Sequence, residues 1–235
     1  MSRTLMAARS RRRSMAREID FAGERRRMVD RLVRSHYVRE PAVRDAFLSV
    51  PREAFVQAAD AADAYADVPL PIGRGQTISA PSMIAIMLEE ARLRSGERVL
   101  EIGTGAGYGA ALLAHLVGAA NVVTIERHAE LAAQGRANLA RVRAAEVTVV
   151  VGDGSLGFSE RAPYDCILAT AGAPHIPEAW PTQLAPRGRI VAPIGPSRQG
   201  QVLVVAMRRA DGSLNVRETT PCAFVPLIGA QAWPE

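Results

Sequence analysis

Lysine is missing from this sequence: all 29 cationic residues of the 235-residue chain are arginine. A P-loop nucleotide site needs a lysine after its glycines, so that kind of site is excluded. The arginines are unevenly distributed, because residues 1–52 contain 14 arginines and 6 acidic residues, whereas residues 53–235 contain 15 and 18. We therefore interpret residues 1–24 as a basic, disordered arm that precedes the folded domain. A separate hypothesis is that this arm binds nucleic acid weakly and in a salt-sensitive way.

Cysteines and long apolar segments are also scarce. The two cysteines, Cys166 and Cys222, are too few for a disulfide framework, and neither they nor the four histidines have the spacing of metal ligands. No run approaches the ~18 apolar residues of a transmembrane helix, and no apolar segment follows the N-terminal arginines as it does in a secretory signal. We expect a cytoplasmic monomer that holds no metal ion and has no membrane partner.

Hydrophobic periodicity predicts an α/β fold. From residue 98 onward, short apolar segments alternate with helical patterns, which is typical of a mostly parallel, twisted sheet with helices on both faces. The expected strands are 98–103, 121–126, 146–152, 164–170 and 188–193, and the expected helices are 108–117, 128–142 and 177–184. Two further segments, 201–207 and 214–221, flank an Asp211-Gly212 turn and predict an antiparallel C-terminal hairpin.

The first part of the chain has a different pattern. Helical spacing predicts an N-terminal helical cap at 17–35 and 42–49 and a further helix at 81–95, with Ser79 as the N-cap of that helix. The segment 60–79 is rich in proline and glycine and predicts a loop-rich lid. The expected organisation is a single domain over 25–235, made of N-terminal helices and a substrate loop (25–80), a cofactor-binding core (81–200) and a C-terminal hairpin and tail (201–235).

A glycine-rich segment, Gly103-Thr-Gly-Ala-Gly107, follows the first strand of the alternating part. Glycines there let backbone amides approach a ligand at a helix N-terminus, although a purely structural turn would also account for them. The sixth position counted from Gly103 is Tyr108, which disfavours the dinucleotide fingerprint of nicotinamide enzymes. Glu126 ends the next strand, 23 residues beyond Gly103, where a carboxylate can accept both hydroxyls of a ribose. Asp153 follows the third strand and places another acid at the same edge of the sheet.

These segments are similar to a known family. Residues 99–109 (VLEIGTGAGYG), 124–126 (TIE) and 152–154 (GDG) resemble the S-adenosylmethionine site of class I methyltransferases. Five longer segments resemble, in chain order, the protein-L-isoaspartate O-methyltransferases: VPREAFV at 50–56, YADVPLPIGRGQTISAP at 65–81, APYDCILATAGAP at 162–174, QLAPRGRIVAPIG at 183–195 and FVPLIG at 224–229. The GQTIS sequence is the most specific, because generic methyltransferases do not share it.

The resemblance implies a Rossmann-like class I methyltransferase fold and a set of site residues. Ser79 of GQTIS would be the active-site serine. Glu126 would bind the ribose of the cofactor, Asp153 and Gly154 would flank its adenine, and Gln201 would help to close the site. The full set of implied cofactor contacts is Thr77, Ile78, Glu101, Gly103, Gly105, Glu126, Arg127, Asp153, Gly154 and Gln201.

The implied reaction transfers a methyl group from S-adenosylmethionine, which becomes S-adenosylhomocysteine, to the α-carboxylate of L-isoaspartyl residues in damaged proteins and peptides. Activity on D-aspartyl residues is left open. The ester then allows the following backbone nitrogen to displace methanol, and the resulting succinimide hydrolyses partly to normal aspartate. A carboxylate is already ionised at neutral pH, so alignment is needed more than a general base, and a Ser79 hydroxyl can supply it.

Three alternatives remain at this point. An RNA methyltransferase would use the same cofactor fold with the basic arm on phosphates, although Ala-Gly-Ala-Pro follows the strand at 164–170 instead of a loop that stacks a flipped base. A carboxyl methyltransferase dedicated to one peptide of a biosynthetic pathway would have the same residues. A non-catalytic binding protein would retain the fold without the reaction.

Overall fold

The computed structural model describes residues 19–197 and 200–235. Of the predicted basic arm, residues 1–18 lie outside the described residues. Helix α2 (Phe21–Arg34) begins within the segment assigned to that arm. The Asp20 side chain caps this helix, because it accepts a hydrogen bond from the Gly23 amide at 2.8 Å.

A seven-stranded sheet forms the centre of the molecule, with the strand order β5-β4-β3-β6-β7-β8-β9. The neighbours from β5 to β7 are parallel, whereas β8 is antiparallel to both β7 and β9. The strands are β3 (Val99–Ile102), β4 (Val122–Glu126), β5 (Thr148–Val151), β6 (Tyr164–Ala169), β7 (Leu184–Ile194), β8 (Gln201–Arg208) and β9 (Leu214–Cys222). The predicted Rossmann-like sheet and its antiparallel C-terminal hairpin are confirmed.

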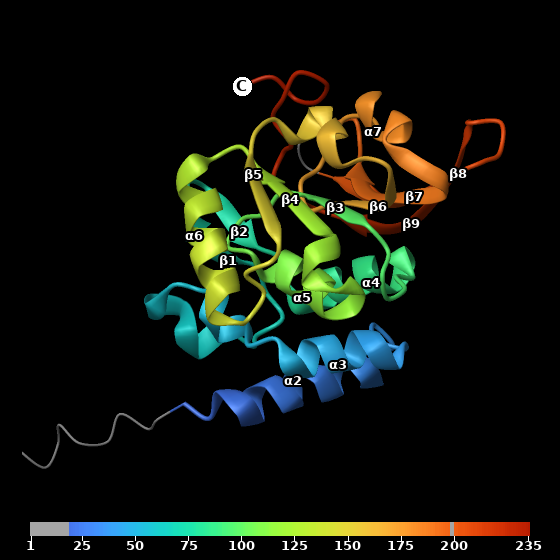
Figure 1. The fold of residues 1–235 in the computed structure, drawn as a ribbon. Coiled ribbons are helices and arrows are strands. Elements are labelled where there is room, and N and C mark those ends of the chain that lie inside the picture. Colours follow the sequence, from blue (N-terminus) through green and yellow to red (C-terminus); the bar gives the residue numbers. More distant parts are fainter. Residues whose placement is uncertain (1–18, 198–199) are drawn as a thin grey trace, which may run out of the picture.

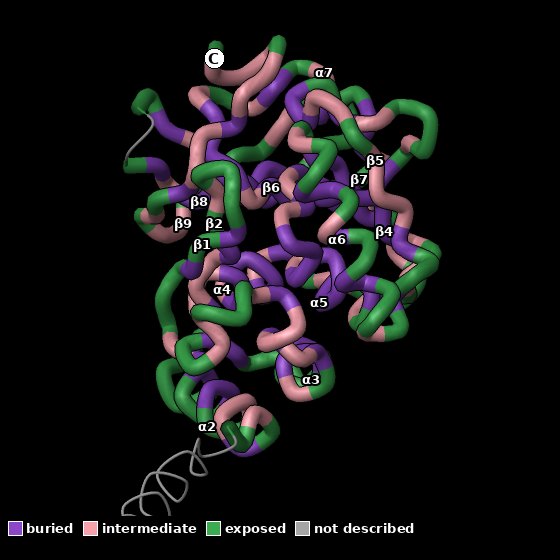
Figure 2. Tube along the Cα trace, turned by 90° about the vertical axis from the view of Figure 1, so that its left-hand side faces the viewer, coloured by how far each residue is buried: buried purple, intermediate pink, exposed green. Residues whose placement is uncertain are grey.

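Helices cover both faces of this sheet (Figure 1). One face packs against α4 (Pro81–Ala91), α5 (Tyr108–Val117) and α6 (Ala129–Arg141). The other packs against α7 (Ala179–Thr182) and short 3-10 segments, with Trp180 fully buried. The central strands β3, β4 and β6 are buried between the two sets, whereas the edge strands β5 and β9 are intermediate or exposed (Figure 2). Helix α7 is shorter than the predicted helix 177–184, because Leu184 already pairs with Tyr164 as part of β7.

The N-terminal helices α2 and α3 (Pro41–Ser49) lie beneath α4 and α5 (Figure 1). The buried face of α2 includes Met28, Val29 and Leu32. Ile19, just before the helix, and Val33, within it, are 39% and 37% exposed. The predicted helical cap is confirmed, and its buried face leaves out both positions.

Residues 70–78 form a β-hairpin and not the irregular loop that the sequence predicted. Strands β1 (Leu70–Gly73) and β2 (Gln76–Ile78) are antiparallel, and they follow a 3-10 segment, Ala58–Asp63. Gly73, Arg74 and Gly75 make the turn, with φ angles of 98°, 53° and 69°. The prediction failed because the proline and glycines that normally break strands are accommodated in a very short, two-stranded sheet.

Ser79 connects this hairpin to α4 without capping the helix, so the predicted N-cap is wrong. Ala80 occupies the N-cap position and makes no side-chain capping bond. The first turn of α4 is instead satisfied from a distance, because the Ser82 amide donates to the Asp67 carboxylate at 2.9 Å. The Ser79 hydroxyl is therefore released from any helix-capping role.

Candidate active site

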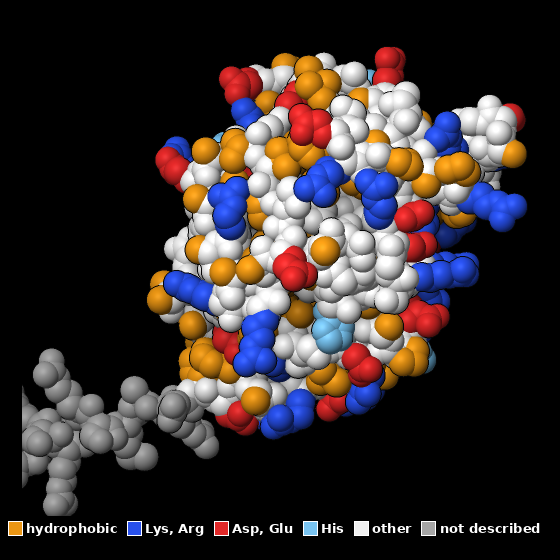
Figure 3. All heavy atoms as spheres, viewed as in Figure 1, with side chains coloured by type: hydrophobic (Ala, Val, Ile, Leu, Met, Phe, Trp, Pro, Cys, Tyr) orange, Lys and Arg blue, Asp and Glu red, His pale blue; other side chains and the backbone are white. Residues whose placement is uncertain are grey.

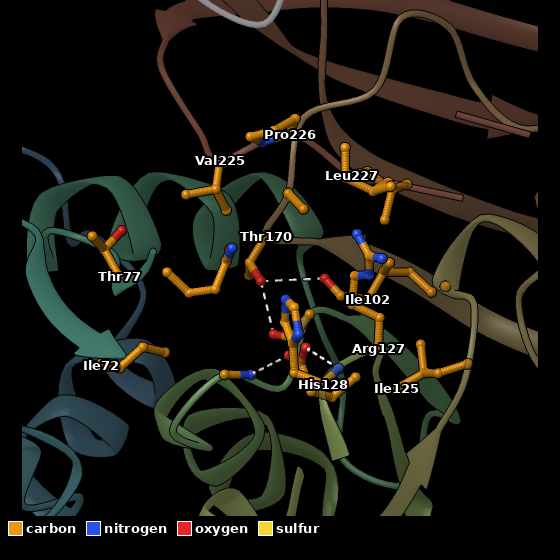
Figure 4. A pocket seen from close by; sticks show the side chains of 17 residues that line it. Ile72, Thr77, Ile102, Ile125, Arg127, His128, Thr170, Val225, Pro226 and Leu227 are labelled. Carbon is orange, nitrogen blue, oxygen red and sulfur yellow. Dashed lines mark hydrogen bonds between the residues drawn. The ribbon is translucent and has the colours of Figure 1, made fainter. Parts of the chain in front are cut away.

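The main cavity lies where the parallel strands end at their carboxyl edge. The β1–β2 hairpin forms one wall, and the segment 225–228 after β9 forms another (Figure 4). Its volume is about 100 Å³. The lining residues are Ile72, Gln76, Thr77, Ile102, Gly103, Gly105, Ile125, Glu126, Arg127, His128, Gly154, Thr170, Ala171, Val225, Pro226, Leu227 and Ile228.

The backbone turn after β3 requires glycine at its first position. Gly103 has a φ of 99°, and a Cβ atom there would lie 2.6 Å from the Thr170 Oγ1 atom. The Thr170 hydroxyl in turn donates to the Gly103 carbonyl at 2.9 Å, which joins the ends of β3 and β6. A side chain at residue 103 would both strain the backbone and break this junction.

Glu126 connects the glycine turn to the end of β4. Its carboxylate accepts hydrogen bonds from the Gly105 amide and the His128 amide, each at 3.0 Å. The residue is only 7% exposed, yet it lines the cavity. A carboxylate fixed by two backbone donors still has acceptor capacity for the hydroxyls of a ligand.

A smaller cavity of about 40 Å³ shares Ile72, Thr77, Gly103, Gly105 and Thr170 with the main one. Among its other lining residues are Ile78, Ser79, Glu101 and Gly109. The two cavities therefore form adjoining parts of one site around the glycine turn.

Glu101 is the buried acid of this smaller cavity. Its carboxylate accepts a hydrogen bond from the Thr124 hydroxyl at 2.6 Å, and a Cβ atom on Gly109 would lie 2.1 Å from its Oε1 atom. Loss of hydration raises the pKa of Glu101 to about 8, and the charge of Glu126 acts in the same direction. Glu101 is consequently mainly protonated at neutral pH, and it lies close to the glycine turn.

Ser79 is half-buried at the end of the hairpin and faces the smaller cavity. Within 19–197 and 200–235, no residue forms a hydrogen bond with its hydroxyl group. A free hydroxyl beside Gly103 and Gly105 can donate to an oxygen atom of a bound ligand.

Two of the predicted cofactor contacts, Asp153 and Gln201, line neither of these two cavities. Gln201 is 1% exposed, and its side chain accepts from the Phe224 amide at 2.7 Å. The Asp153 carboxylate accepts from the Ala230 amide at 2.7 Å and from the Ser155 amide and hydroxyl. Burial alone would raise the pKa of Asp153, but these hydrogen bonds hold it below the usual value. Both residues thus fix the C-terminal segment that closes the cavity.

The structure brings together most of the other predicted site residues. Thr77, Gly103, Gly105, Glu126, Arg127 and Gly154 line the main cavity, and Ile78, Ser79 and Glu101 line the smaller one. Sequence reasoning missed Thr170 and His128 as lining residues. Their positions directly after β6 and β4 were the available signal, because ligands of such sheets bind beyond the carboxyl ends of the strands.

Comparison with known proteins agrees with this arrangement. Residues 23–232 match the family model described as protein-L-isoaspartate(D-aspartate) O-methyltransferase. The chain belongs to this family. It is accordingly an S-adenosylmethionine-dependent methyltransferase.

Relatives in this family resemble the chain over nearly its whole length. A protein-L-isoaspartate O-methyltransferase of Hyperthermus butylicus is 50% identical over 92% of each chain. One of Pyrococcus abyssi is 45% identical over 89% of this chain and 97% of its own. A solved structure of a protein with the same name superposes with a TM-score of 0.79 at 30% identity, covering 88% of this chain and 67% of that one. A putative family member from Plasmodium falciparum, solved with S-adenosyl-L-homocysteine, has a TM-score of 0.77 at 24% identity, over 90% of this chain and 99% of its own, and shows the shared fold.

In the described part of the chain, no helix is both long and apolar enough to cross a membrane. Within the same residues, no three or more His, Cys, Asp or Glu side chains are grouped so that they could hold a metal ion.

Proposed function

We propose that the adjoining cavities hold S-adenosylmethionine, with Glu126 on its ribose and Ser79 beside the reacting carboxylate. The overall reaction is that of the family: methyl transfer to the α-carboxylate of L-isoaspartyl residues in damaged proteins. When bound, S-adenosylmethionine supplies a methyl group activated by a sulfonium ion. The residues of the chain bind and align the two reactants and exclude water from them.

The lining residues suit an adenosine group. Ile102, Ile125 and Leu227 lie together at one end of the main cavity (Figure 4) and offer apolar surface to a flat base. Glu126, held by the Gly105 and His128 amides, offers acceptors to a ribose at the adjoining position. The apolar surface and the carboxylate acceptors on these walls therefore suit the base and the ribose of the cofactor. Asp153 contributes indirectly, because it holds the C-terminal segment through the Ala230 amide.

We place the methyl acceptor beside Ser79 because the hydroxyl group of this residue is free to bind it. The hydroxyl is uncharged, so it can donate a hydrogen bond to a substrate carboxylate without repelling the sulfonium ion or binding the carboxylate as tightly as a cation would. Methyl transfer to an ionised carboxylate needs no proton to be removed. Alignment of the two reacting atoms then provides the main acceleration, which effective molarities value at up to ~7–11 kcal/mol.

The partners, the compartment and the oligomeric state of the enzyme are proposed from the sequence alone. Isoaspartyl proteins and peptides are the expected partners, and the enzyme is expected to act as a cytoplasmic monomer. The exposed β1–β2 hairpin and the segment 224–228 lie on either side of the cavity, and we assign the substrate backbone to the space between them.

The decisive experiment is transfer of labelled methyl from S-adenosylmethionine to a short L-isoaspartyl peptide. The same peptide with normal aspartate is the matched control, and a D-aspartyl version and total RNA are added as further acceptors. Base-labile label on the isoaspartyl peptide, and none on the aspartyl peptide or RNA, is the expected result. Label on RNA alone would favour the nucleic-acid methyltransferase, and activity confined to one natural peptide would favour a pathway-specific enzyme.

A further inference from the structure

A second groove lies at the opposite edge of the sheet from the cofactor cavity. It is bounded by the end of α4, the starts of β6 and β7, and the β8–β9 hairpin, and its volume is about 750 Å³. Cavities of this size accommodate whole small-molecule ligands. We call it the basic groove and define it by its six arginines: Arg39, Arg92, Arg94, Arg187, Arg189 and Arg217.

The acids in the basic groove are already engaged. Glu97 forms an ion pair with Arg189 and also accepts the Arg94 amide at 3.0 Å. Glu90 pairs with Arg217, and Asp165 accepts the Arg98 amide. Arg39 also forms an ion pair with Glu89 beside the groove, so the six arginines face four acids and an excess of two positive charges remains. Figure 3 shows basic side chains gathered at the right-hand edge of the molecule, below β8 and β9, with acidic ones between them.

Arg189 makes the floor of the groove rigid. It is 8% exposed and donates to the backbone carbonyls of Ala91, Arg92 and Asp165, so that it joins the end of α4 to β6 and β7. The N–H donors of its guanidinium group are occupied by these bonds and by the ion pair with Glu97. It therefore supports the groove and leaves ligand binding to its neighbours.

Three arginines of the basic groove remain available. Arg92, Arg94 and Arg187 are exposed, and their guanidinium groups make no hydrogen bond or ion pair with any residue in 19–197 or 200–235. Arg92 ends α4 with a φ of 47°, and Arg187 has a φ of 65°. Glycine is the usual residue for that conformation, so two of the three arginines occupy backbone positions that disfavour residues with a Cβ atom.

We propose that the basic groove binds the oligophosphate group of a small anion, such as inorganic tripolyphosphate or a nucleoside triphosphate. Guanidinium groups match phosphate oxygens in geometry and bind them with two hydrogen bonds each. The lining contains no aromatic side chain that could stack on a base. Recognition therefore depends on the phosphates, and the site is independent of the methyl transfer reaction.

The test measures binding of tripolyphosphate to the full-length protein by calorimetry at low salt. S-adenosylhomocysteine is present throughout, so that the cofactor cavity is blocked. The groove variant Arg92→Gln/Arg94→Gln/Arg187→Gln is compared with a control variant, Arg26→Gln/Arg34→Gln/Arg143→Gln. The control positions are exposed, form no ion pair within the described residues, and include Arg143 with a φ of 63°. The charge change is therefore the same in both variants, and the control also replaces one arginine in the left-handed conformation, against two in the groove variant. Methyl transfer to the isoaspartyl peptide verifies that both variants are folded.

The expected result is a loss of affinity of at least about tenfold in the groove variant, with the control variant unchanged. ATP should bind about as tightly as tripolyphosphate, and adenosine should not compete, because phosphates alone are recognised. Equal loss in both variants would show a general charge effect and overturn the proposal. Competition by adenosine would show that the site recognises the nucleoside and not the phosphates alone, and would also overturn it. A nucleic-acid oligomer that binds while tripolyphosphate does not would assign the surface to a different partner.

Discussion

The Gly105 amide donates to the Glu126 carboxylate across 3.0 Å, which ties the glycine turn after β3 to the end of β4. The same carboxylate accepts the His128 amide, so one side chain orders both loops that line the cofactor cavity. If Glu126 binds the ribose as we propose, ligand binding and loop order depend on the same two oxygen atoms. This dependence distinguishes Glu126 from an acid that only contacts a ligand.

Glu126→Gln should weaken S-adenosylhomocysteine binding by more than about tenfold. The amide group of glutamine directs an N–H group at one of the two backbone donors, and a hydrogen bond to a charged acceptor is worth ~1.5–3 kcal/mol. Calorimetric titration of the cofactor product measures the effect, with the exposed Glu146→Gln as the matched control. Unchanged affinity in Glu126→Gln would mean that the ligand lies elsewhere.

Ser79→Ala should lower kcat about tenfold to a hundredfold while the affinity for S-adenosylhomocysteine is retained. Removal of the hydroxyl costs the hydrogen bond that aligns the substrate carboxylate, ~1.5–3 kcal/mol for a charged acceptor. Because Ser79 does not cap α4, the thermal unfolding midpoint should stay the same. Ser82→Ala in the first turn of α4 is the control. A variant with full turnover would remove Ser79 from the reaction, and a variant with a lowered midpoint would return it to a structural role.

The contrast between helix α5 and the hairpin shows what local patterns can predict. The expected helix 108–117 agrees with α5 to the residue, because glycines flank a continuous helical pattern on both sides. The β1–β2 hairpin was missed, because its turn at Gly73-Arg74-Gly75 and its proline dominate two very short strands. The central parallel strands are short apolar segments that stand out between helical patterns in the sequence, whereas a short hairpin is stabilised by its tertiary contacts.

The candidate site was predictable to the extent that strand ends define it. Glu126 and the glycines follow their strands directly, and the structure brings them together at the cavity. Ser79 was misassigned as a cap because the residue that satisfies the first turn of α4 is Asp67, which is 15 residues before its partner Ser82 in the sequence and near it only in the fold. Asp153 and Gln201 likewise bond to the C-terminal segment, a pairing over long sequence separation that no local pattern contains. The sequence therefore does not show which hydrogen-bond partners the buried polar side chains have.

Glu101 should make the protein less stable as the pH rises from 5 to 8. Its folded-state pKa of about 8 lies above the ordinary value of 4.5, so the folded state binds the proton more tightly than the unfolded state does. The stabilisation is complete below the ordinary pKa and is lost as the pH rises through the folded one, on the order of 5 kcal/mol in the limit. Urea unfolding of the wild type and of Glu101→Gln across this pH range measures the difference, because glutamine still accepts from Thr124 but does not ionise. Parallel pH dependences for the two proteins would rule out Glu101 as the titrating group.

Arg74 and Glu130 form an ion pair that joins the tip of the β1–β2 hairpin to the first turn of α6. The two elements carry opposite walls of the main cavity, with Ile72 and Thr77 on the hairpin side and residues 126–128 just before α6. At about 100 Å³ the cavity is smaller than the ~300–1,000 Å³ typical of small-molecule sites, so we expect the walls to separate when the proposed cofactor enters or leaves. The ion pair is therefore placed to slow that opening.

Arg74→Gln should accelerate release of S-adenosylhomocysteine a few-fold in stopped-flow measurements, with little change in unfolding free energy. Both side chains are exposed, so high salt should screen the pair and bring the wild type to the rate of the variant. The charge exchange Arg74→Glu/Glu130→Arg should restore slow release, which neither single change does. Arg26→Gln, on the distant helix α2, is the matched control. A release rate that is independent of salt and equal in all these proteins would show that the hairpin opens without regard to this contact, and the barrier would then belong to the C-terminal segment held by Asp153 and Gln201.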